Sequence, residues 1–482
     1  MSRRLVTKML ALASCPRQPE DHSAPPPKLR QRRRALLAAT LALGLCVLGG
    51  RSDGADANAR SRASDPLAAE LAGAFRIDVS SIDVTYDFWP SRPRIVGSAT
   101  LRFEMRPGQS RALFHFNPLR RGREPERAML TALELDGKPL DPDDDRDLRR
   151  IRPAPGAEPA FEIQRHLSAG NEHTLQVEWS MPKPKPPADA RWFYNNFDDT
   201  EGPKDETEAL WPTISSPEAL IRHRIRLRVH SASPYTVLGS GSVRRHHSAA
   251  GVQAWDIDTG RPISSSNVFF AAVPSDQFRT DHFSASGVDV KIVSNLASKA
   301  RKQAKAITRS AVARLIDDFG PFPMPRMQIL LTEWDSGMEY YGATHTGLGS
   351  LAHELGHMYF GTTAVNRTWR DTWLDESIVV WWEDHASLDP VGAKFRSAIG
   401  AGRPVAAPGF DESAYAEGAR VLEAIARAMG GDRKMMSFLA DLHSHRKFRP
   451  FTTADFIDDV VAAQNAIDRK QLQRWLLTPE DN

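Results

Sequence analysis

A histidine and glutamate pattern near residue 355 could hold a metal ion and carry out hydrolysis. His353, Glu354 and His357 form an HExxH sequence. On a helix the two imidazoles stand at i and i+4 on one face, where both can bind the same ion. Zinc held in this way takes a third protein ligand and keeps one place for water, whose pKa it lowers toward about 7. Glu354 is then the expected general base that takes a proton from the zinc-activated water.

The third ligand is expected on the next helical stretch. A histidine at position 363 would indicate the three-histidine class of zinc peptidases, but Thr363 stands there. Glu376 follows His357 by nineteen residues, the arrangement of peptidases whose third ligand is glutamate. Glu383 returns to nearly the same helix face after two turns and could accept the second ring N–H of a metal-bound histidine. Asp375, which precedes Glu376, is placed among the same supporting residues.

Cysteine usage limits the kind of metal site. Cys15 and Cys46 are the two cysteines, and both lie in the N-terminal leader. The remaining chain can therefore contain neither a disulfide nor a thiolate metal site. We predict one Zn²⁺ per chain, held by His353, His357 and Glu376, although these ligand types also permit other divalent ions.

The charge balance excludes a nucleic-acid partner. The formal charge is +3, from 63 basic and 60 acidic residues. Ten of the bases and four of the acids precede residue 60, so 53 bases and 56 acids remain in the body. A mildly acidic body offers no cationic surface for a phosphate backbone, so we expect no DNA or RNA partner.

Residues 1–59 have the features of an export signal. Arg32 to Arg34 precede an apolar run from Ala35 to Gly50, and Ala57 to Ala59 form a small-residue cleavage pattern. The apolar run is short for a membrane span of about 20 residues. We expect an exported protein, located in the periplasm, in the envelope or outside the cell, with an uncleaved anchor as the alternative. Membrane contact is expected only if the leader is retained or Cys46 is lipidated.

The body divides into two parts by its sequence pattern. Residues 60–75 are a linker, and short alternating segments separated by Pro, Gly and Asp predict an all-β domain at 76–284. The second domain, 285–482, is expected to contain a helix at 295–318, a strand at 327–331 and helices after residue 351.

Two segments of the second domain resemble the M1 family of zinc aminopeptidases, gluzincins that include aminopeptidase N and leukotriene A4 hydrolase. His353 to Gly361 (HELGHMYFG) resembles the family's HExxHxWFG, and Trp373 to Ser377 (WLDES) resembles its WLNEG. The resemblance implies an N-terminal all-β domain followed by a thermolysin-like, mainly helical zinc-peptidase domain with a small mixed sheet. It stops near Trp475, so we expect a short form without the family's C-terminal helical domain.

Two further segments resemble family motifs that contact the substrate. Gly337, Met338, Glu339 and Tyr340 (GMEY) together resemble the family's GxMEN, which implies that Glu339 binds the substrate's free α-amino group. Tyr340 stands where that motif has Asn. Tyr415, in YAEG, is similar to the tyrosine of the family's YEKG, which implies that it hydrogen-bonds the tetrahedral oxyanion.

These residues predict a zinc-dependent peptidase that acts on peptides, with an aminopeptidase as the leading interpretation. A zinc endopeptidase with an open cleft is an alternative, since Tyr340 alters the amine-binding motif and the closing domain is not expected. A non-catalytic, zinc-stabilised protein of the cell envelope that binds peptides is the third interpretation. The sequence favours none of the possible side-chain preferences or oligomeric states.

Overall fold

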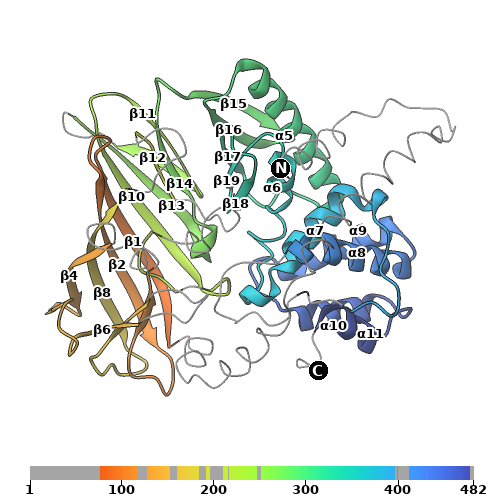
Figure 1. Cartoon of the computed structure of the whole chain (residues 1–482), viewed down its shortest axis with the longest axis horizontal. Coiled ribbons are helices and arrows are strands. Elements are labelled where there is room, and N and C mark those ends of the chain that lie inside the picture. Colours follow the sequence, from red (N-terminus) through yellow and green to blue (C-terminus); the bar gives the residue numbers. More distant parts are fainter. Residues whose placement is uncertain are drawn as a thin grey trace, which may run out of the picture.

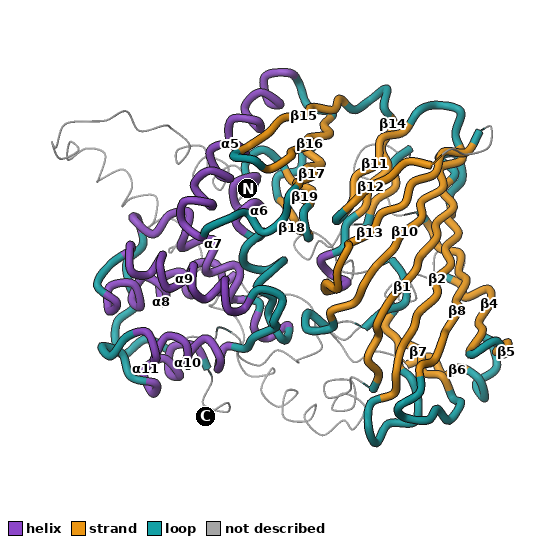
Figure 2. The backbone as a smooth tube through the Cα atoms, turned by 180° about the vertical axis from the view of Figure 1, so that it is seen from behind, coloured by secondary structure: helices purple, strands orange, loops and turns teal. Residues whose placement is uncertain are grey.

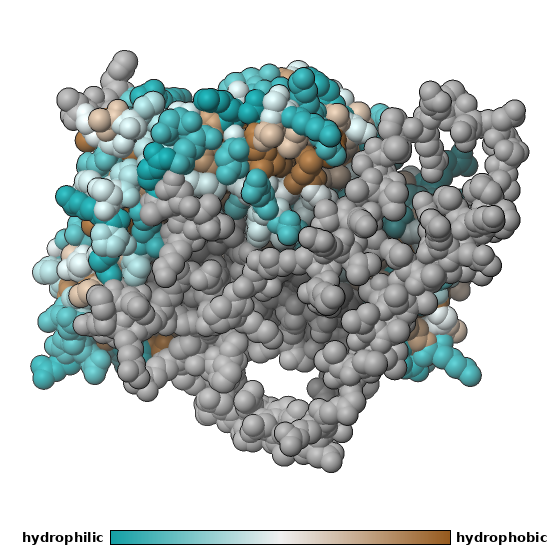
Figure 3. Space-filling view, turned by 45° about the horizontal axis from the view of Figure 1, so that its top comes forward, coloured by the Kyte–Doolittle hydropathy of each residue, from teal (hydrophilic) through white to brown (hydrophobic). Residues whose placement is uncertain are grey.

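The computed structural model describes residues 76–116, 128–151, 160–183, 191–195, 210–214, 216–246, 251–396, 399 and 412–477. The predicted leader at 1–59 and linker at 60–75 lie outside the described residues. Among the helices that are described, none combines the length and the apolar character needed to cross a membrane. Hydrophilic residues predominate on the described part of the face in Figure 3, around a small group of hydrophobic ones.

An eight-stranded sheet forms the largest layer of the N-terminal half (Figure 1). β1 and β10 run parallel in it, whereas the other neighbours are antiparallel. In pairing order the strands are β12 (Ser242–His246), β13 (Val252–Ser264), β10 (Leu220–His230), β1 (Ile77–Phe88), β2 (Arg94–Met105), β8 (Glu172–Pro182), β4 (Met129–Leu135) and β5 (Lys138–Leu140).

Two small sheets pack on the apolar face of the large one. One contains β11 (Tyr235–Gly239), β14 (Phe270–Pro274) and β9 (Phe193–Tyr194), and the other contains β3 (Leu113–His115), β7 (Ala160–Ile163) and β6 (Leu148–Ile151). Tyr86 of β1 lies 5.3 Å from the Phe193 ring and 5.4 Å from the Phe270 ring. Phe103 of β2 lies 5.3 Å from the Phe114 ring. These aromatic contacts form the core of a sandwich. The large side chains stand at every second residue of the central strands, because alternate residues of a strand face the same side.

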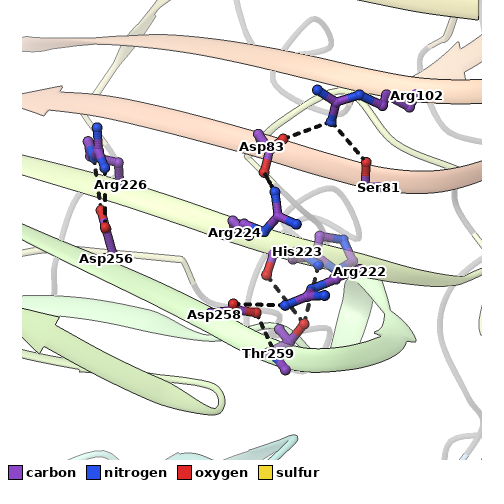
Figure 4. A network of polar contacts seen from close by, with 11 residues as sticks. Ser81, Asp83, Arg102, Arg222, His223, Arg224, Arg226, Asp256, Asp258 and Thr259 are labelled. Atoms are coloured by element: carbon purple, nitrogen blue, oxygen red, sulfur yellow. Dashed lines mark hydrogen bonds and ion pairs between the residues drawn. The ribbon is translucent and has the colours of Figure 1, made fainter.

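The opposite face of the large sheet carries a row of arginines from β10. Figure 4 shows Arg222, Arg224 and Arg226, each of which faces an aspartate on a neighbouring strand. Arg224 lies 3.1 Å from Asp83, Arg222 lies 3.1 Å from Asp258, and Arg226 pairs with Asp256. Pairs as exposed as these contribute at most about 1 kcal/mol each. The row is therefore a locally neutralised, solvated surface rather than a cationic patch.

The second half begins with a five-stranded sheet, which Figures 1 and 2 show between the large sheet and the helices. Its pairing order is β15 (Arg279–Ala285), β16 (Val288–Ser294), β17 (Arg326–Leu331), β19 (Ala343–Thr346) and β18 (Gly337–Tyr340). The helix α5 (Ser298–Phe319) connects the parallel strands β16 and β17. This element and β17 confirm the predicted helix and strand within a few residues. The boundary predicted after residue 284 falls at the last residue of β15, an edge strand that pairs with β16 of the same sheet.

Helices make up most of the described chain after residue 350. They are α6 (Leu351–Gly356), α7 (Trp373–Asp384), α8 (Glu412–Met429), α9 (Asp432–Arg446), α10 (Thr453–Ala463) and α11 (Arg469–Leu476). The fold is thus mixed α and β, with a β-rich N-terminal part and later helices.

Polar side chains of the five-stranded sheet tie it to β11 of the N-terminal half. Gln328 of β17 donates from Nε2 to the Gly239 carbonyl at 2.6 Å, and this bond is buried. Lys291 of β16 donates from Nζ to the Val237 carbonyl at 2.8 Å. Both acceptors are main-chain carbonyls of β11, so the two hydrogen bonds fix the position of the five-stranded sheet relative to that strand.

Candidate metal centre and active site

The HExxH residues lie on and just after the short helix α6. His353 and Glu354 belong to α6, and His357 is its C-cap residue. A Cβ at Gly356 would lie 2.8 Å from Val379 Cγ1 on α7, so this glycine allows the two helices to approach closely. Glycine costs about 1 kcal/mol in a helix relative to alanine. The close approach accounts for a glycine at this position despite that cost, because it brings Glu376, in the first turn of α7, to the histidines.

The predicted ligand atoms converge on one point. His353 Nε2 lies 3.0 Å from His357 Nε2 and 3.1 Å from Glu376 Oε2. The third edge, from His357 Nε2 to Glu376 Oε2, is 3.4 Å. Ligands at about 2.0–2.1 Å from a tetrahedral zinc ion lie about 3.3 Å from one another. The triangle therefore has the dimensions of three corners of a zinc tetrahedron.

The other ring nitrogens define which protons the histidines carry. His353 Nδ1 lies 3.0 Å from Glu383 Oε2, and His357 Nδ1 lies 3.1 Å from the Phe360 carbonyl oxygen. Both partners are acceptors, so each Nδ1 donates a hydrogen bond. In the neutral rings both Nε2 atoms then present lone pairs, toward each other and toward the Glu376 carboxylate. Three acceptors without a donor require a cation between them.

Electrostatics gives the same result for the histidines. Burial alone would lower the pKa of His357, but Glu339 and Glu376 outweigh it and raise that pKa to about 10. Burial likewise opposes protonation of His353, whose pKa is nevertheless raised well above its usual value by Glu383 and Glu376. Without a metal ion the site would draw protons onto its imidazoles. The surroundings thus demand positive charge at this point.

Three more buried carboxyl groups surround the cluster. Burial raises the pKa of Glu354 to about 8, and it also raises the pKa of Glu339. The pKa of Asp375 rises to about 8, because of burial and then because of the Glu376 charge. A bound cation favours the ionised form of each group. The site therefore suits a metal ion together with a second positive group.

Strand β18 places its alternate side chains in two different surroundings. Glu339 is buried, and one of its oxygens lies within 4.8 Å of ligand atoms of His357 and Asp375. Tyr340 instead stacks on Phe269, with ring centroids 4.8 Å apart, and Met338 packs against the same aromatic cluster. The residue that replaces the motif's Asn is therefore part of the core.

Gly337 and Tyr415 complete the predicted set. A Cβ at Gly337 would overlap the Glu354 carboxylate, so only glycine leaves room for it. The Tyr415 ring of α8 lies 6.1 Å from the His353 ring and is half-buried. The structure brings together these predicted site residues: Gly337, Glu339, His353, Glu354, His357, Asp375, Glu376, Glu383 and Tyr415. Met338, which was also predicted, packs against the aromatic cluster on the other side of β18 instead.

Ser377 contributes to the site, although its type alone did not indicate this. Its hydroxyl donates to the carbonyl of Ala414, the residue before Tyr415. A Cβ at Gly418, one turn further on, would overlap Ser377 Oγ. The departure of Ser377 from the family's Gly, together with the glycine in YAEG, is the signal that could have revealed this pair.

Removing the Glu383 carboxylate should weaken metal binding. Outer partners of metal-bound histidines typically change metal affinity 10–100-fold when lost. We expect Glu383→Ala to raise the Kd for Zn²⁺ at least about tenfold in competition with a fluorescent chelator. The control is Asp384→Ala on the same helix, where the carboxylate bonds Ser387 instead. Equal Kd values for the two variants would contradict the role of Glu383.

The Ser377–Gly418 contact predicts a size exchange between α7 and α8. Gly418→Ala should lower the free energy of unfolding by about 1–3 kcal/mol, because the added methyl overlaps the serine hydroxyl. Adding Ser377→Gly should restore part of the loss, with Trp373 Cε3 still 3.2 Å away. Gly392→Ala, which meets open space, is the control in calorimetry. A double variant no more stable than Gly418→Ala would refute this packing.

Comparisons with known proteins were made for the sequence and for the fold. No protein-family model matches the sequence, and no curated protein matches it. The fold is similar to an M1 zinc metallopeptidase from Deinococcus radiodurans, with a TM-score of 0.62 and 19% identity over 84% of this chain and 95% of that one. It is also similar to Legionella pneumophila aminopeptidase A, with a TM-score of 0.64 and 13% identity over 84% of this chain and 50% of that one. The chain therefore has the two-domain fold of the M1 zinc metallopeptidases.

Proposed function

We propose that the chain is a zinc-dependent aminopeptidase, built on an all-β domain and a thermolysin-like domain. The observation that carries this proposal is the triangle formed by His353 Nε2, His357 Nε2 and the Glu376 carboxylate. A zinc ion held there would lower the pKa of a water molecule and polarise the substrate's carbonyl group. His353, His357 and Glu376 are the proposed ligands.

Glu354 is the proposed general base. It follows His353 on α6, is buried, and has a pKa raised to about 8 by that burial. A carboxylate in such surroundings takes a proton from an attacking water more readily than a solvated one, because protonation relieves the cost of a buried charge. We propose that Glu354 then passes this proton to the leaving amine.

Glu339 is the proposed anchor for the substrate's α-ammonium group. A buried carboxylate has a strong preference for a positively charged partner, and an ammonium supplies both the charge and hydrogen-bond donors. Gly337 precedes it by two residues on β18 and lies against the Glu354 carboxylate, on the same side of the strand as Glu339. An anchor at this distance from the ligands favours cleavage after the N-terminal residue.

Tyr415 is the proposed hydrogen-bond donor to the developing oxyanion. Its ring approaches that of His353 from α8. This helix follows the two histidines in the sequence, whereas β18 precedes them. A phenol directed at the site of developing charge lowers the barrier without being consumed. The proposal for Tyr415 rests on this proximity and on the YAEG resemblance.

Ligands of structural neighbours support a peptide substrate. A variant of the Deinococcus radiodurans metallopeptidase was crystallised with a Tyr-Ser-Ala substrate. Variants of a two-domain M1 zinc metallopeptidase were crystallised with L-arginine and with L-tryptophan. The Legionella enzyme was crystallised with aspartic acid. We propose short peptides with a free N-terminus as the substrate class here, and export through the leader as the route to them.

An endopeptidase is the second candidate, because of Tyr340. The side chain at this position packs on Phe269 and offers the substrate no amide. An N-terminus would then be held by Glu339 alone among the β18 side chains. A non-catalytic peptide-binding protein would instead bind zinc without hydrolysing any peptide.

Replacing the general base should separate metal binding from turnover. Glu354→Gln removes the proton acceptor but none of the proposed ligands. We expect one equivalent of zinc to be retained and kcat to fall by about 10²-fold or more. Metal analysis and hydrolysis of an aminoacyl fluorogenic amide are the measurements. Activity above about a tenth of wild type would rule out this role for Glu354.

Blocking the substrate's amine should abolish cleavage if Glu339 is its anchor. We expect chelator-sensitive hydrolysis of free aminoacyl amides and none of their N-acetylated forms. Glu339→Gln should raise KM and reduce kcat/KM on free substrates by about 10-fold or more, since a charge-assisted bond is lost. Equal cleavage of free and acetylated substrates by wild type would establish the endopeptidase instead.

A further inference from the structure

We propose that Asn267, a residue of the β-rich half, positions the metal site and the amine anchor relative to each other. Asn267 ends the short 3₁₀ helix η2 (Ser265–Asn267) between β13 and β14. Its side-chain amide donates to the Gly361 carbonyl, which belongs to neither a proposed metal ligand nor a predicted substrate residue. The inference rests on the proposed function and adds to it a positioning residue that acts from the first half of the chain.

The side chain of Asn267 holds the loop that follows the metal-binding helix. Its Nδ2 donates to the Gly361 carbonyl at 2.9 Å, in a buried hydrogen bond. Gly361 follows Phe360, whose carbonyl oxygen accepts the bond from His357 Nδ1. Any shift of the Gly361 peptide group is therefore transmitted to the acceptor that orients the His357 imidazole.

Gly361 lies directly against the metal site, which leaves its loop little freedom. It adopts φ +109, and a Cβ there would lie 3.2 Å from His357 Nδ1 and 3.1 Å from Asp375 Oδ2. Only glycine combines this backbone conformation with such a close approach. The loop that Asn267 holds thus lies against His357, a proposed ligand, and against Asp375, which precedes the proposed ligand Glu376.

The main chain of Asn267 holds the strand that carries the amine anchor. Its carbonyl accepts a hydrogen bond from the Tyr341 amide at 2.9 Å and another from Ser240 Oγ at 3.2 Å. Tyr341 directly follows β18, which contains Glu339. The stacking of Tyr340 on Phe269 supports the same junction two residues away.

One residue therefore bonds both parts of the proposed site. Its side chain sets the position of the His357 loop, and its carbonyl sets the position of β18. The spacing between the metal and the Glu339 carboxylate decides which peptide bond reaches the metal, so a small displacement costs catalytic efficiency. Loss of the Asn267 amide should release the loop while β18 keeps its main-chain bond.

Gln328 provides a matched control. Its side-chain amide also donates to a main-chain carbonyl between the two halves, at 2.6 Å and buried, but its acceptor is Gly239. That bond joins β17 to β11 and involves none of the proposed site residues. Asn267→Leu and Gln328→Met each remove one buried hydrogen-bond donor that joins the two halves of the chain, and each keeps a side chain of similar size.

The test measures metal geometry and catalysis in the full-length chain. Cobalt(II) replaces zinc, and its visible absorption spectrum reports the coordination geometry before any substrate is added. For Asn267→Leu we expect an altered cobalt spectrum, a Kd for Zn²⁺ raised about 10-fold or more, and a similar fall in kcat/KM. Gln328→Met should keep the wild-type spectrum and Kd. If Asn267→Leu does not fold, Asn267→Asp removes the donor at constant shape.

Two results would overturn the inference. One is a cobalt spectrum and Kd in the Asn267 variant that match wild type. The other is an equal change in Gln328→Met, which would indicate general loosening between the halves. A wild-type protein that binds cobalt tetrahedrally but cleaves no peptide would instead refute the proposed function, and the metal measurements on Asn267 would still decide its positioning role.

Discussion

The structure depends on three hydrogen-bond acceptors that face one another with no donor among them. The Nε2 atoms of the two imidazoles and the Glu376 carboxylate lie 3.0–3.4 Å apart. The Nδ1 atoms of the same imidazoles already hydrogen-bond to Glu383 and to the Phe360 carbonyl. Such a group is unfavourable in a buried site unless a cation lies between its members. The close approach of α6 and α7 at Gly356 is what brings the two histidines and Glu376 together.

The same constraint explains why so many carboxyl groups are buried nearby. Glu339, Glu354 and Asp375 have raised pKa values because burial disfavours their charge. A divalent ion at the triangle and an ammonium at Glu339 would stabilise the charged forms. Under the proposed function, metal binding, substrate binding and the protonation of these groups would therefore be linked, and metal binding would contribute to the stability of the folded chain.

The three candidate metal ligands could be proposed from the sequence, two of them from local spacing and Glu376 from the nineteen-residue spacing of peptidases whose third ligand is glutamate. His353 and His357 share a helix face by helical periodicity, and Glu383 returns to the face of Glu376 after two turns. The long helix α5 and strand β17 were predicted for the same reason. The position of β15 at the edge of the five-stranded sheet was not predicted, since strand pairing depends on the packing that surrounds each strand.

Contacts between distant segments could not be predicted. Asn267 lies 94 residues from the Gly361 carbonyl that it bonds, and no periodicity connects them. The acceptor for His357 is a main-chain carbonyl, which residue type does not reveal. The core position of Tyr340 follows from the strand alternation with Glu339, but only once the aromatic cluster on that side of β18 is known.

X-ray absorption at the zinc edge of the full-length, zinc-loaded protein tests the central claim most directly. The account predicts four or five light ligands at about 2.0–2.2 Å, with the multiple-scattering pattern of two imidazoles. His357→Ala should show one imidazole at the same site. A spectrum without imidazole scattering, or one that His357→Ala leaves unchanged, would show that the metal binds elsewhere and would contradict the account.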